Sequence, residues 1–502
     1  MNRKKRAVVN IICSLLLEIV TIGSGLIVPR LIIEAYGSGT NGLVNSITSF
    51  IGYIALLQSG IGAVIRSALY RPLAKHDHEA VCIIATTTER FFRKIAYVSI
   101  AYIIALAFLF PTVITKEYDF AFTFILVIII GVSTAAQYFF GITSQMILEA
   151  DQSSFIYSVI QIATVVLNTV FSVILIKSGC SIQQVKAVAS IFFVARPLII
   201  GAYTKRKYNL TNKYGINNEL IAQRWDGLAQ GLAYFLHSKT DVFVLTVLSS
   251  LENVSIYSVY ALVTTGLTSI VNSIDKAIKA VLGNIFANDD IDEIRGCFDS
   301  YLNMTHFITT VLFATASVSV FKFVELYTKG VTDAEYIQPL FAIIIISAES
   351  LYCYRLPYNA IINVAGKFKE TKRDAMIEAV INIVLSCILV PFFGLVGVAI
   401  GTWVAMIFRT VSFIIFLHTD VLMLDYKNQL KRYLTTFLSY IVCVAIGIQI
   451  NINVPDYLVW LIYTVAVMIG TGALTLMVNL VMMKKETLSA VKFLFKSKRN
   501  NT

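Results

Sequence analysis

The chain has 502 residues, of which 57% are hydrophobic and only 14% are charged, and its formal net charge is +11. A soluble chain of this length would hold about three domains and carry about 25% charged residues. The composition therefore excludes an ordinary soluble protein and predicts an integral membrane protein.

Apolar stretches of at least about 18 residues recur about fourteen times along the chain. Because the hydrocarbon core holds no water for the backbone, we expect each stretch to be a transmembrane α-helix. The first stretch follows the basic run MNRKKR, and we interpret it as a retained span because it is too long for a secretory signal. The predicted spans are residues 7–34, 44–70, 92–114, 121–147, 155–178, 184–203, 226–249, 256–283, 302–326, 338–363, 374–393, 395–418, 433–450 and 457–483.

The lysines and arginines are distributed unevenly between the two sides of the predicted membrane. If the N-terminus is cytoplasmic, 28 of the 41 fall in inner loops and tails, 4 in outer loops and 9 within spans. The positive-inside rule then places both termini in the cytoplasm. The basic residues face anionic inner-leaflet lipid, so the net charge indicates membrane lipid and no nucleic acid as partner.

The seven cysteines and five histidines suggest neither a disulfide framework nor a metal site. The sequence contains no Cys-x-x-Cys motif, and most cysteines fall in spans, where they are expected to pack as small apolar side chains. We therefore expect no metal and no cofactor.

The chain shows signs of an internal duplication. Residues 61–77 align without a gap with residues 274–290, with five identities in seventeen positions, and Arg66 falls opposite Lys279. Six predicted spans separate the copies, so both enter the membrane in the same direction, as in parallel transporter repeats. The predicted organisation is an N-lobe of six spans (1–203), a cytoplasmic linker (204–225), a C-lobe of six spans (226–418), two C-terminal spans (419–483) and a basic cytoplasmic tail (484–502).

Two stretches carry a family resemblance. The run VPRLIIEAYGSGTNGLVNSITSFIGYIALLQSGIGAVIRSALYRPLAKHD (28–77) and the run EAVINIVLSCILVPFFGLVGVAIGT (378–402) resemble the polysaccharide flippases of the multidrug/oligosaccharidyl-lipid/polysaccharide exporter superfamily. The resemblance implies two pseudo-symmetric six-helix bundles plus two C-terminal helices, alternating access, and a cavity lined by the first two spans of each lobe.

The same resemblance implies a cargo and a location. The cargo would be an undecaprenyl-diphosphate-linked oligosaccharide moved outward across a bacterial cytoplasmic membrane, with a polymerase and other polysaccharide assembly proteins as partners. Related peptidoglycan-precursor flippases carry an Arg-Asp pair in the first span, where this chain has Val28 and Pro29. This departure argues against a peptidoglycan role.

The cations within the spans fit such a cargo. Each costs about 2.5–3.5 kcal/mol at the membrane centre, so it is expected to face a bundle interior or a wet cavity, and arginine and lysine both bind phosphate. We expect Arg66 and Lys279 to receive the diphosphate, one from each lobe. The nine span cations are Arg30, Arg66, Arg196, Lys239, Lys276, Lys279, Lys322, Arg355 and Arg409. The predicted substrate-binding residues are Arg30, Arg66, Lys239, Lys276, Lys279, Arg355 and Arg409.

Two other interpretations of these cations remain open. Cations close to a helix end, such as Arg66 and Arg30, can extend to the lipid headgroups at little cost. Lys279 lies four residues after Asp275, which is the spacing of a simple helical ion pair.

Three acidic residues are candidates for coupling transport to Na⁺ or to a proton. Glu18, Asp241 and Glu349 lie within predicted spans, where buried carboxylates mark ion paths. The alternative is a local salt bridge, such as His237 with Asp241, or Arg355 with a neighbouring carboxylate.

Two rival functions compete with the flippase interpretation. A cation-coupled drug exporter of the same superfamily would need a carboxylate-lined cavity, whereas nine span cations compare here with seven carboxylates, several of them at helix ends. A membrane glycosyltransferase or polymerase would need a sizeable outer loop, but the longest predicted outer connection, 327–337, carries no paired carboxylates at useful spacing. The sequence therefore favours a transporter of an anionic cargo over an enzyme.

Overall fold

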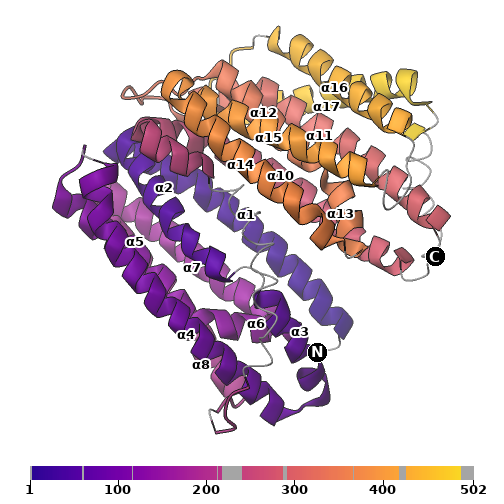
Figure 1. Cartoon of the computed structure of the whole chain (residues 1–502). Coiled ribbons are helices and arrows are strands. Elements are labelled where there is room, and N and C mark those ends of the chain that lie inside the picture. Colours follow the sequence, from indigo (N-terminus) through magenta and orange to yellow (C-terminus); the bar gives the residue numbers. More distant parts are fainter. Residues whose placement is uncertain are drawn as a thin grey trace. The chain divides into compact units, whose positions relative to one another are not determined.

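A computed structural model describes most of the chain. The described residues are 3–58, 61–115, 117–211, 213–217, 240–286, 291–365, 367–417, 426–450, 452–484 and 486–487. These residues form helices and connecting turns, with no strand among them (Figure 1). The predicted all-α membrane fold is confirmed.

Twelve helices of the described chain are long and apolar enough to cross a membrane. Each corresponds to one of the fourteen predicted spans, and they are the segments Val8–Tyr36, His78–Ile114, Phe120–Ala150, Ser154–Lys177, Ile182–Lys207, Leu251–Lys276, Ile294–Tyr327, Pro339–Val364, Glu370–Phe393, Leu395–Phe416, Lys427–Ile448 and Tyr457–Met482. The predicted span 226–249 lies mostly outside the described residues, although 240–248 is helical.

The prediction of one continuous helix over 44–70 is wrong. The structure instead has α2 (Ser38–Gly52), a 3₁₀ segment η1 (Tyr53–Gln58) and a separate helix α3 (Ile61–Lys75). At the break, the Phe50 carbonyl accepts a hydrogen bond from the Tyr53 N–H and a second from the Tyr102 hydroxyl, at 3.0 Å. Helix α2 ends at Gly52, a residue that disfavours helix continuation, so apolarity alone does not keep the segment helical.

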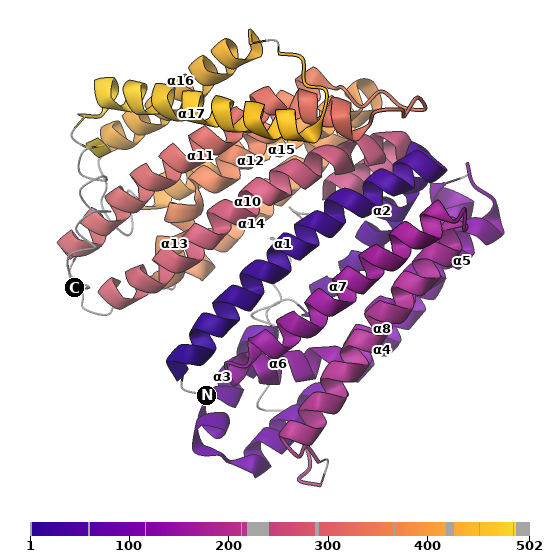
Figure 2. The same cartoon turned by 180° about the vertical axis from the view of Figure 1, so that it is seen from behind.

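The chain divides into two compact units, 1–255 and 256–502, with the boundary inside α10 (Leu251–Phe286). Unit 1 contains, after α3, the helices α4 (His78–Leu109), α5 (Phe120–Ala136), α6 (Ile142–Ala150), α7 (Ser154–Lys177) and α8 (Ile182–Lys207). The first helix, α1 (Arg3–Tyr36), runs alongside α7 (Figures 1 and 2). The core of unit 1 is aliphatic and aromatic, with Phe92 and Phe110 fully buried.

Local sequence signals mark where several unit 1 helices begin. The Asp77 side chain accepts from the Ala80 N–H at 3.0 Å at the start of α4. At the start of α8, Ser181 and Gln184 form a reciprocal capping box. These contacts satisfy amide groups that a helix start otherwise leaves unpaired.

Unit 2 contains α11 (Ile291–Tyr327), α12 (Pro339–Tyr354), α13 (Leu356–Val364), α14 (Phe368–Phe393), α15 (Leu395–Phe416), α16 (Tyr426–Ile448) and α17 (Tyr457–Met482). Helices α14 and α15 form a tight antiparallel pair joined at Gly394, whose φ of 53° favours glycine. A Cβ on Gly397 would lie 2.6 Å from the Leu389 backbone, so the glycine permits this close packing. The last two helices, α16 and α17, pack against α11 (Figure 2).

Candidate substrate and ion sites

Arg66 lies on α3 and is paired with a carboxylate from α6. Its Nη1 donates to Glu149 Oε2 at 3.0 Å, and Gln145 Nε2 donates to the other oxygen, Oε1, at 2.8 Å. A Cβ on Gly62 would lie 3.1 Å from Arg66 Nη1, so this glycine leaves room for the guanidinium. The Arg66 side chain is 37% exposed, which leaves part of the guanidinium able to contact a ligand.

The other predicted residues of unit 1 lie in different surroundings. Arg30 Nη2 is 3.8 Å from Glu34 Oε2, one turn further along α1. Glu18 is exposed on α1, whereas Asp241 is buried. Lys239 lies outside the described residues.

In unit 2, Lys279 forms the helical ion pair with Asp275 that the sequence allowed as an alternative to cavity lining. Its Nζ is 2.6 Å from Asp275 Oδ2 on the same helix, α10. The second oxygen of Asp275 accepts from the Tyr301 hydroxyl of α11 at 2.5 Å. Lys276, three residues before Lys279, is exposed. The two lysines therefore have different surroundings.

Arg355 and Arg409 are brought together by a shared carboxylate. Arg355 Nη1 donates to Glu378 Oε1 at 2.6 Å, and Arg409 Nε lies 3.6 Å from Glu378 Oε2. Arg409 also donates to the Thr371 carbonyl at 2.9 Å and lies over the Phe413 ring. All three charged side chains are no more than 10% exposed, so they form a buried cluster between α12, α14 and α15.

The sequence reasoning missed the acidic partners of these cations. Glu149 lies just beyond the predicted end of its span, and Glu378 lies within a predicted span but is not among the seven carboxylates set against the span cations. The signal was present, because a single acidic residue in the apolar run from 375 to 393 is costly to bury without a cation. Glu349, one of the predicted ion-coupling residues, is half-buried on α12 of unit 2. The excess of span cations is therefore smaller than the sequence comparison suggested.

The two residues aligned by the proposed repeat differ locally. Arg66 lies on the short helix α3 and pairs across to α6, while Lys279 lies on the 36-residue helix α10 and pairs within it. Their common role in binding a diphosphate stays a prediction.

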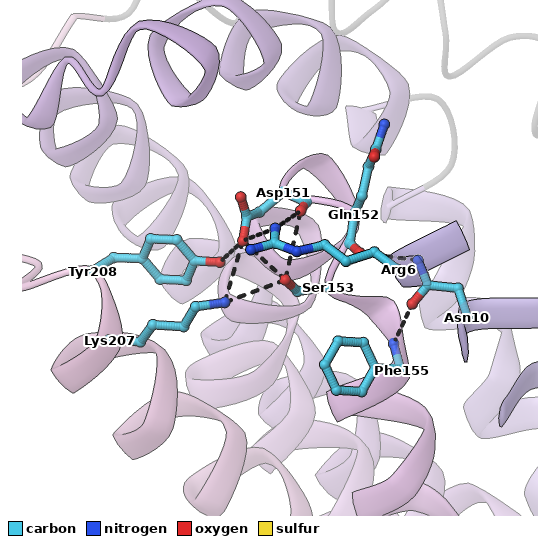
Figure 3. A network of polar contacts seen from close by, with 8 residues as sticks. All are labelled: Arg6, Asn10, Asp151, Gln152, Ser153, Phe155, Lys207 and Tyr208. Carbon is cyan, nitrogen blue, oxygen red and sulfur yellow. Dashed lines mark hydrogen bonds and ion pairs between the residues drawn. The ribbon is translucent and has the colours of Figure 1, made fainter. Parts of the chain in front are cut away.

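A network of hydrogen bonds and ion pairs connects the start of α1 to the rest of unit 1 (Figure 3). Asp151, in the turn between α6 and α7, accepts from the Tyr208 hydroxyl at 2.6 Å and the Lys207 ammonium at 3.2 Å. Arg6 donates to the Asp151 backbone carbonyl at 3.1 Å. One turn further along α1, Asn10 accepts from the Phe155 N–H at 2.8 Å. None of these contacts was predicted from the sequence, because they join residues between 56 and 145 positions apart.

The ionisation of Asp151 follows from this network. Burial acts to raise the pKa of Asp151, but hydrogen bonds from Tyr208, Ser153 and Lys207 outweigh burial and hold it below its ordinary value. Burial and the hydrogen bond to Asp151 raise the pKa of Tyr208. Asp151 is therefore a stable anion at neutral pH.

Unit 1 also contains a small cavity of about 170 Å³ between α4, α6 and α8. Its polar lining includes Thr86, Glu89, Thr143, Ser144 and Lys205, with Lys205 Nζ 3.6 Å from Glu89 Oε1. Of the predicted substrate-binding residues that the structure describes, none lines this cavity.

The three-dimensional structure resembles solved transporters. A lipid II flippase, MurJ, in an inward closed conformation matches over 93% of this chain and 98% of its own, with a TM-score of 0.66 and 14% identity. The chain has the fold of the multidrug/oligosaccharidyl-lipid/polysaccharide exporter transporters. An inward-facing MATE-family multidrug resistance transporter of this superfamily matches over 78% of this chain and 94% of its own, with a TM-score of 0.61 and 15% identity.

Another transporter of this fold, the MATE multidrug transporter DinF-BH in complex with R6G, matches over 85% of this chain and 98% of its own, with a TM-score of 0.61 and 15% identity. No protein-family model and no curated protein matches the sequence. The match to the MurJ flippase covers a larger share of this chain than either of these two MATE matches.

Proposed function

We propose that this protein is an alternating-access flippase that moves a polyprenyl-diphosphate-linked oligosaccharide from the inner to the outer leaflet for surface polysaccharide assembly. The observation that carries the proposal is the extent of the structural match. The MurJ flippase structure covers 93% of this chain, whereas the two MATE transporters cover 78% and 85%, although all three are matched over at least 94% of their own lengths.

The proposal includes the predicted location, partners and coupling. The protein lies in a bacterial cytoplasmic membrane with both termini on the cytoplasmic side. The carrier lipid is undecaprenyl diphosphate, and a polymerase and other assembly proteins receive the product. Na⁺ or a proton drives transport through Glu18, Asp241 or Glu349. Reconstituted protein should therefore lose transport when both the Na⁺ and proton gradients are collapsed; unchanged transport would refute the coupling.

A cation-coupled drug exporter is the second candidate. Two observations favour it: MATE transporters share the fold, and the described span cations Arg66, Lys279, Arg355 and Arg409 each lie beside a carboxylate. Paired cations present less net positive charge to a diphosphate than unpaired cations do.

The two candidates are distinguished by offering both cargoes to the same proteoliposomes. A fluorescent polyprenyl-diphosphate oligosaccharide is placed in one leaflet, and its appearance in the other is followed by chemical quenching. Uptake of a fluorescent organic cation is measured in parallel. The flippase proposal expects movement of the diphosphate lipid and no uptake of the cation, and the reverse result would establish the exporter.

The role of Arg66 is tested with its partner as the matched control. Arg66→Gln alone leaves the half-buried Glu149 without its cation, so a loss of transport could reflect a damaged structure. The double variant Arg66→Gln/Glu149→Gln removes both charges, and Glu149→Gln alone frees the arginine. If Arg66 binds the diphosphate, the double variant loses diphosphate transport while Glu149→Gln retains it. Normal transport by the double variant would exclude Arg66 from cargo binding.

The same design applies to Lys279 and its partner. Lys279→Gln/Asp275→Asn should lose diphosphate transport, whereas Asp275→Asn should retain it. Retained transport in the double variant would refute the assignment of Lys279 without refuting the flippase itself.

A further inference from the structure

Unit 2 buries a histidine that none of the contacts above involves. His306, on α11, is 4% exposed and faces α16. The rings of Tyr354 and Tyr433 flank it, each with its centroid 4.9 Å from that of the imidazole. An ionisable ring inside a membrane helix bundle is costly to keep and is therefore a candidate for a specific role.

The hydrogen bonds around His306 determine which of its nitrogens carries the proton. Nδ1 lies 2.9 Å from Thr436 Oγ1. A hydroxyl has one proton, and Thr436 donates it to the Arg432 carbonyl at 2.8 Å. Thr436 must then accept from the ring, so Nδ1 carries the proton. Nε2 of the neutral imidazole is left as an acceptor.

Three nearby hydroxyls, those of Thr310, Tyr354 and Tyr358, are already committed to other acceptors and do not donate to Nε2. Thr310 donates to the His306 carbonyl at 2.7 Å, so the Tyr354 hydroxyl, 2.9 Å away, must donate to Thr310. The Tyr358 hydroxyl donates to Gln429 at 2.9 Å. Within the described residues, His306 Nε2 is buried and has no hydrogen-bond partner.

Two donors in the adjacent turn of α16 are also buried without partners. They are Arg432 Nε and the Tyr433 hydroxyl, which lies near the Tyr358 side chain without a hydrogen bond of normal geometry. The other two nitrogens of Arg432 are bound, Nη1 to Gln429 and Nη2 to Asp299, both at 3.2 Å. Leaving one buried acceptor and two buried donors unpaired would cost about 1–3 kcal/mol for each. A buried water typically makes about three hydrogen bonds to such groups, accepting from donors while donating to an acceptor.

We propose that unit 2 contains a binding site for a single water molecule between α11 and α16, in which the water donates to His306 Nε2 and accepts from Tyr433 and Arg432. The charged and titratable groups facing the ring are Arg432 and Tyr433 of α16, Tyr354 of α12 and, through Arg432, Asp299 of α11. The backbone of Tyr354 also interacts with the imidazole. Asp299 is 49% exposed, so the ion pair of Arg432 with Asp299 connects the buried site to the exposed surface of unit 2.

The test uses the full-length protein in lipid nanodiscs, labelled with ¹⁵N at histidine, with His306→Gln to assign the signal. At a pH of about 8, where an ordinary imidazole is neutral, His306 should show a protonated Nδ1 and an unprotonated Nε2. Nε2 should also show a cross-peak to water protons. A protonated Nε2, or an unprotonated Nε2 with no water contact, would overturn the proposal.

Thr435 and Thr436 supply a matched pair of variants. Both hydroxyls donate to the carbonyl four residues earlier at 2.8 Å, but of the two only Thr436 lies within hydrogen-bond distance of His306. Thr436→Val should therefore move the proton away from Nδ1, while Thr435→Val should not. Equal effects of the two variants would refute the assigned tautomer.

The variant Tyr433→Phe tests whether a water molecule or the Tyr433 hydroxyl donates the hydrogen bond to His306 Nε2. Because the water, and not Tyr433, donates to the ring, this variant should keep Nδ1 protonated and retain the water cross-peak. A change of tautomer in Tyr433→Phe would show that tyrosine is the donor and that the water site is wrong.

Discussion

Glu378 holds two buried arginines, and its neutralisation is the most informative single perturbation of unit 2. The Glu378 side chain is 7% exposed and lies within 2.6 Å of Arg355 and 3.6 Å of Arg409. Glu378→Gln keeps the shape but removes the carboxylate that the two buried cations share. Breaking a buried ion pair by removing one partner costs about 3–5 kcal/mol.

Thermal unfolding in detergent or nanodiscs measures this effect. At about 2–4 °C per kcal/mol for a unit of this size, Glu378→Gln should lower the Tm by about 6–20 °C. Glu370→Gln is the matched control on the same helix, because Glu370 pairs with Lys367 at 3.4 Å while 44% exposed. An exposed pair contributes about 0–1 kcal/mol, so the control should shift the Tm by less than about 4 °C.

The result that would refute this reasoning is a Tm for Glu378→Gln equal to that of Glu370→Gln. Arg355 and Arg409 would then be stable in unit 2 without their carboxylate, as expected of cations that face water. Their assignment to a wet substrate cavity would be strengthened. A large destabilisation would instead indicate that these two arginines serve mainly to hold α12, α14 and α15 together.

Three further changes test other contacts. Gly42→Ala should destabilise unit 1 by about 3 kcal/mol or more, because the added Cβ would overlap the Leu251 carbonyl oxygen; a native yield and Tm would contradict this. Asp151→Asn should cost about 1.5–3 kcal/mol at neutral pH. Because folding lowers the Asp151 pKa, its contribution is present above the ordinary carboxyl range and is lost as pH falls through the folded pKa, so the Tm gap between native and variant should narrow on acidification; a constant gap would refute it. Tyr301→Phe should cost about 1.5–3 kcal/mol by removing the hydrogen bond to Asp275, and an unchanged Tm would show that this contact contributes nothing.

Much of the architecture could be predicted from local sequence. Long apolar runs predicted the positions of all twelve long helices in the described chain, because each span must satisfy its own backbone hydrogen bonds within the membrane. The exception was 44–70, where apolarity persists across a break. At the break the Phe50 carbonyl also accepts a hydrogen bond from Tyr102, 52 residues away in sequence, and no local pattern reveals this contact.

The candidate site was less predictable than the fold. The Asp275–Lys279 pair could be read from sequence, because a spacing of four residues brings two side chains together on any helix. The pairing of Arg66 with Glu149 could not, since it joins helices α3 and α6 across 83 positions. The shared use of Glu378 by Arg355 and Arg409 likewise needs three helices to be packed.

The sequence by itself determined that this chain is a multi-span helical membrane protein, because the side-chain composition of each segment sets the free energy of its transfer into hydrocarbon. A segment that enters the hydrocarbon must then be helical, since its backbone groups have no water to pair with. Only the tertiary structure decided which charge lies beside which. Electrostatic partners are set by distances of a few ångströms between helices remote in sequence, and burial makes those distances decisive for the energy. The buried nitrogen of His306 illustrates the same point, because its environment exists only where α11, α12 and α16 pack together.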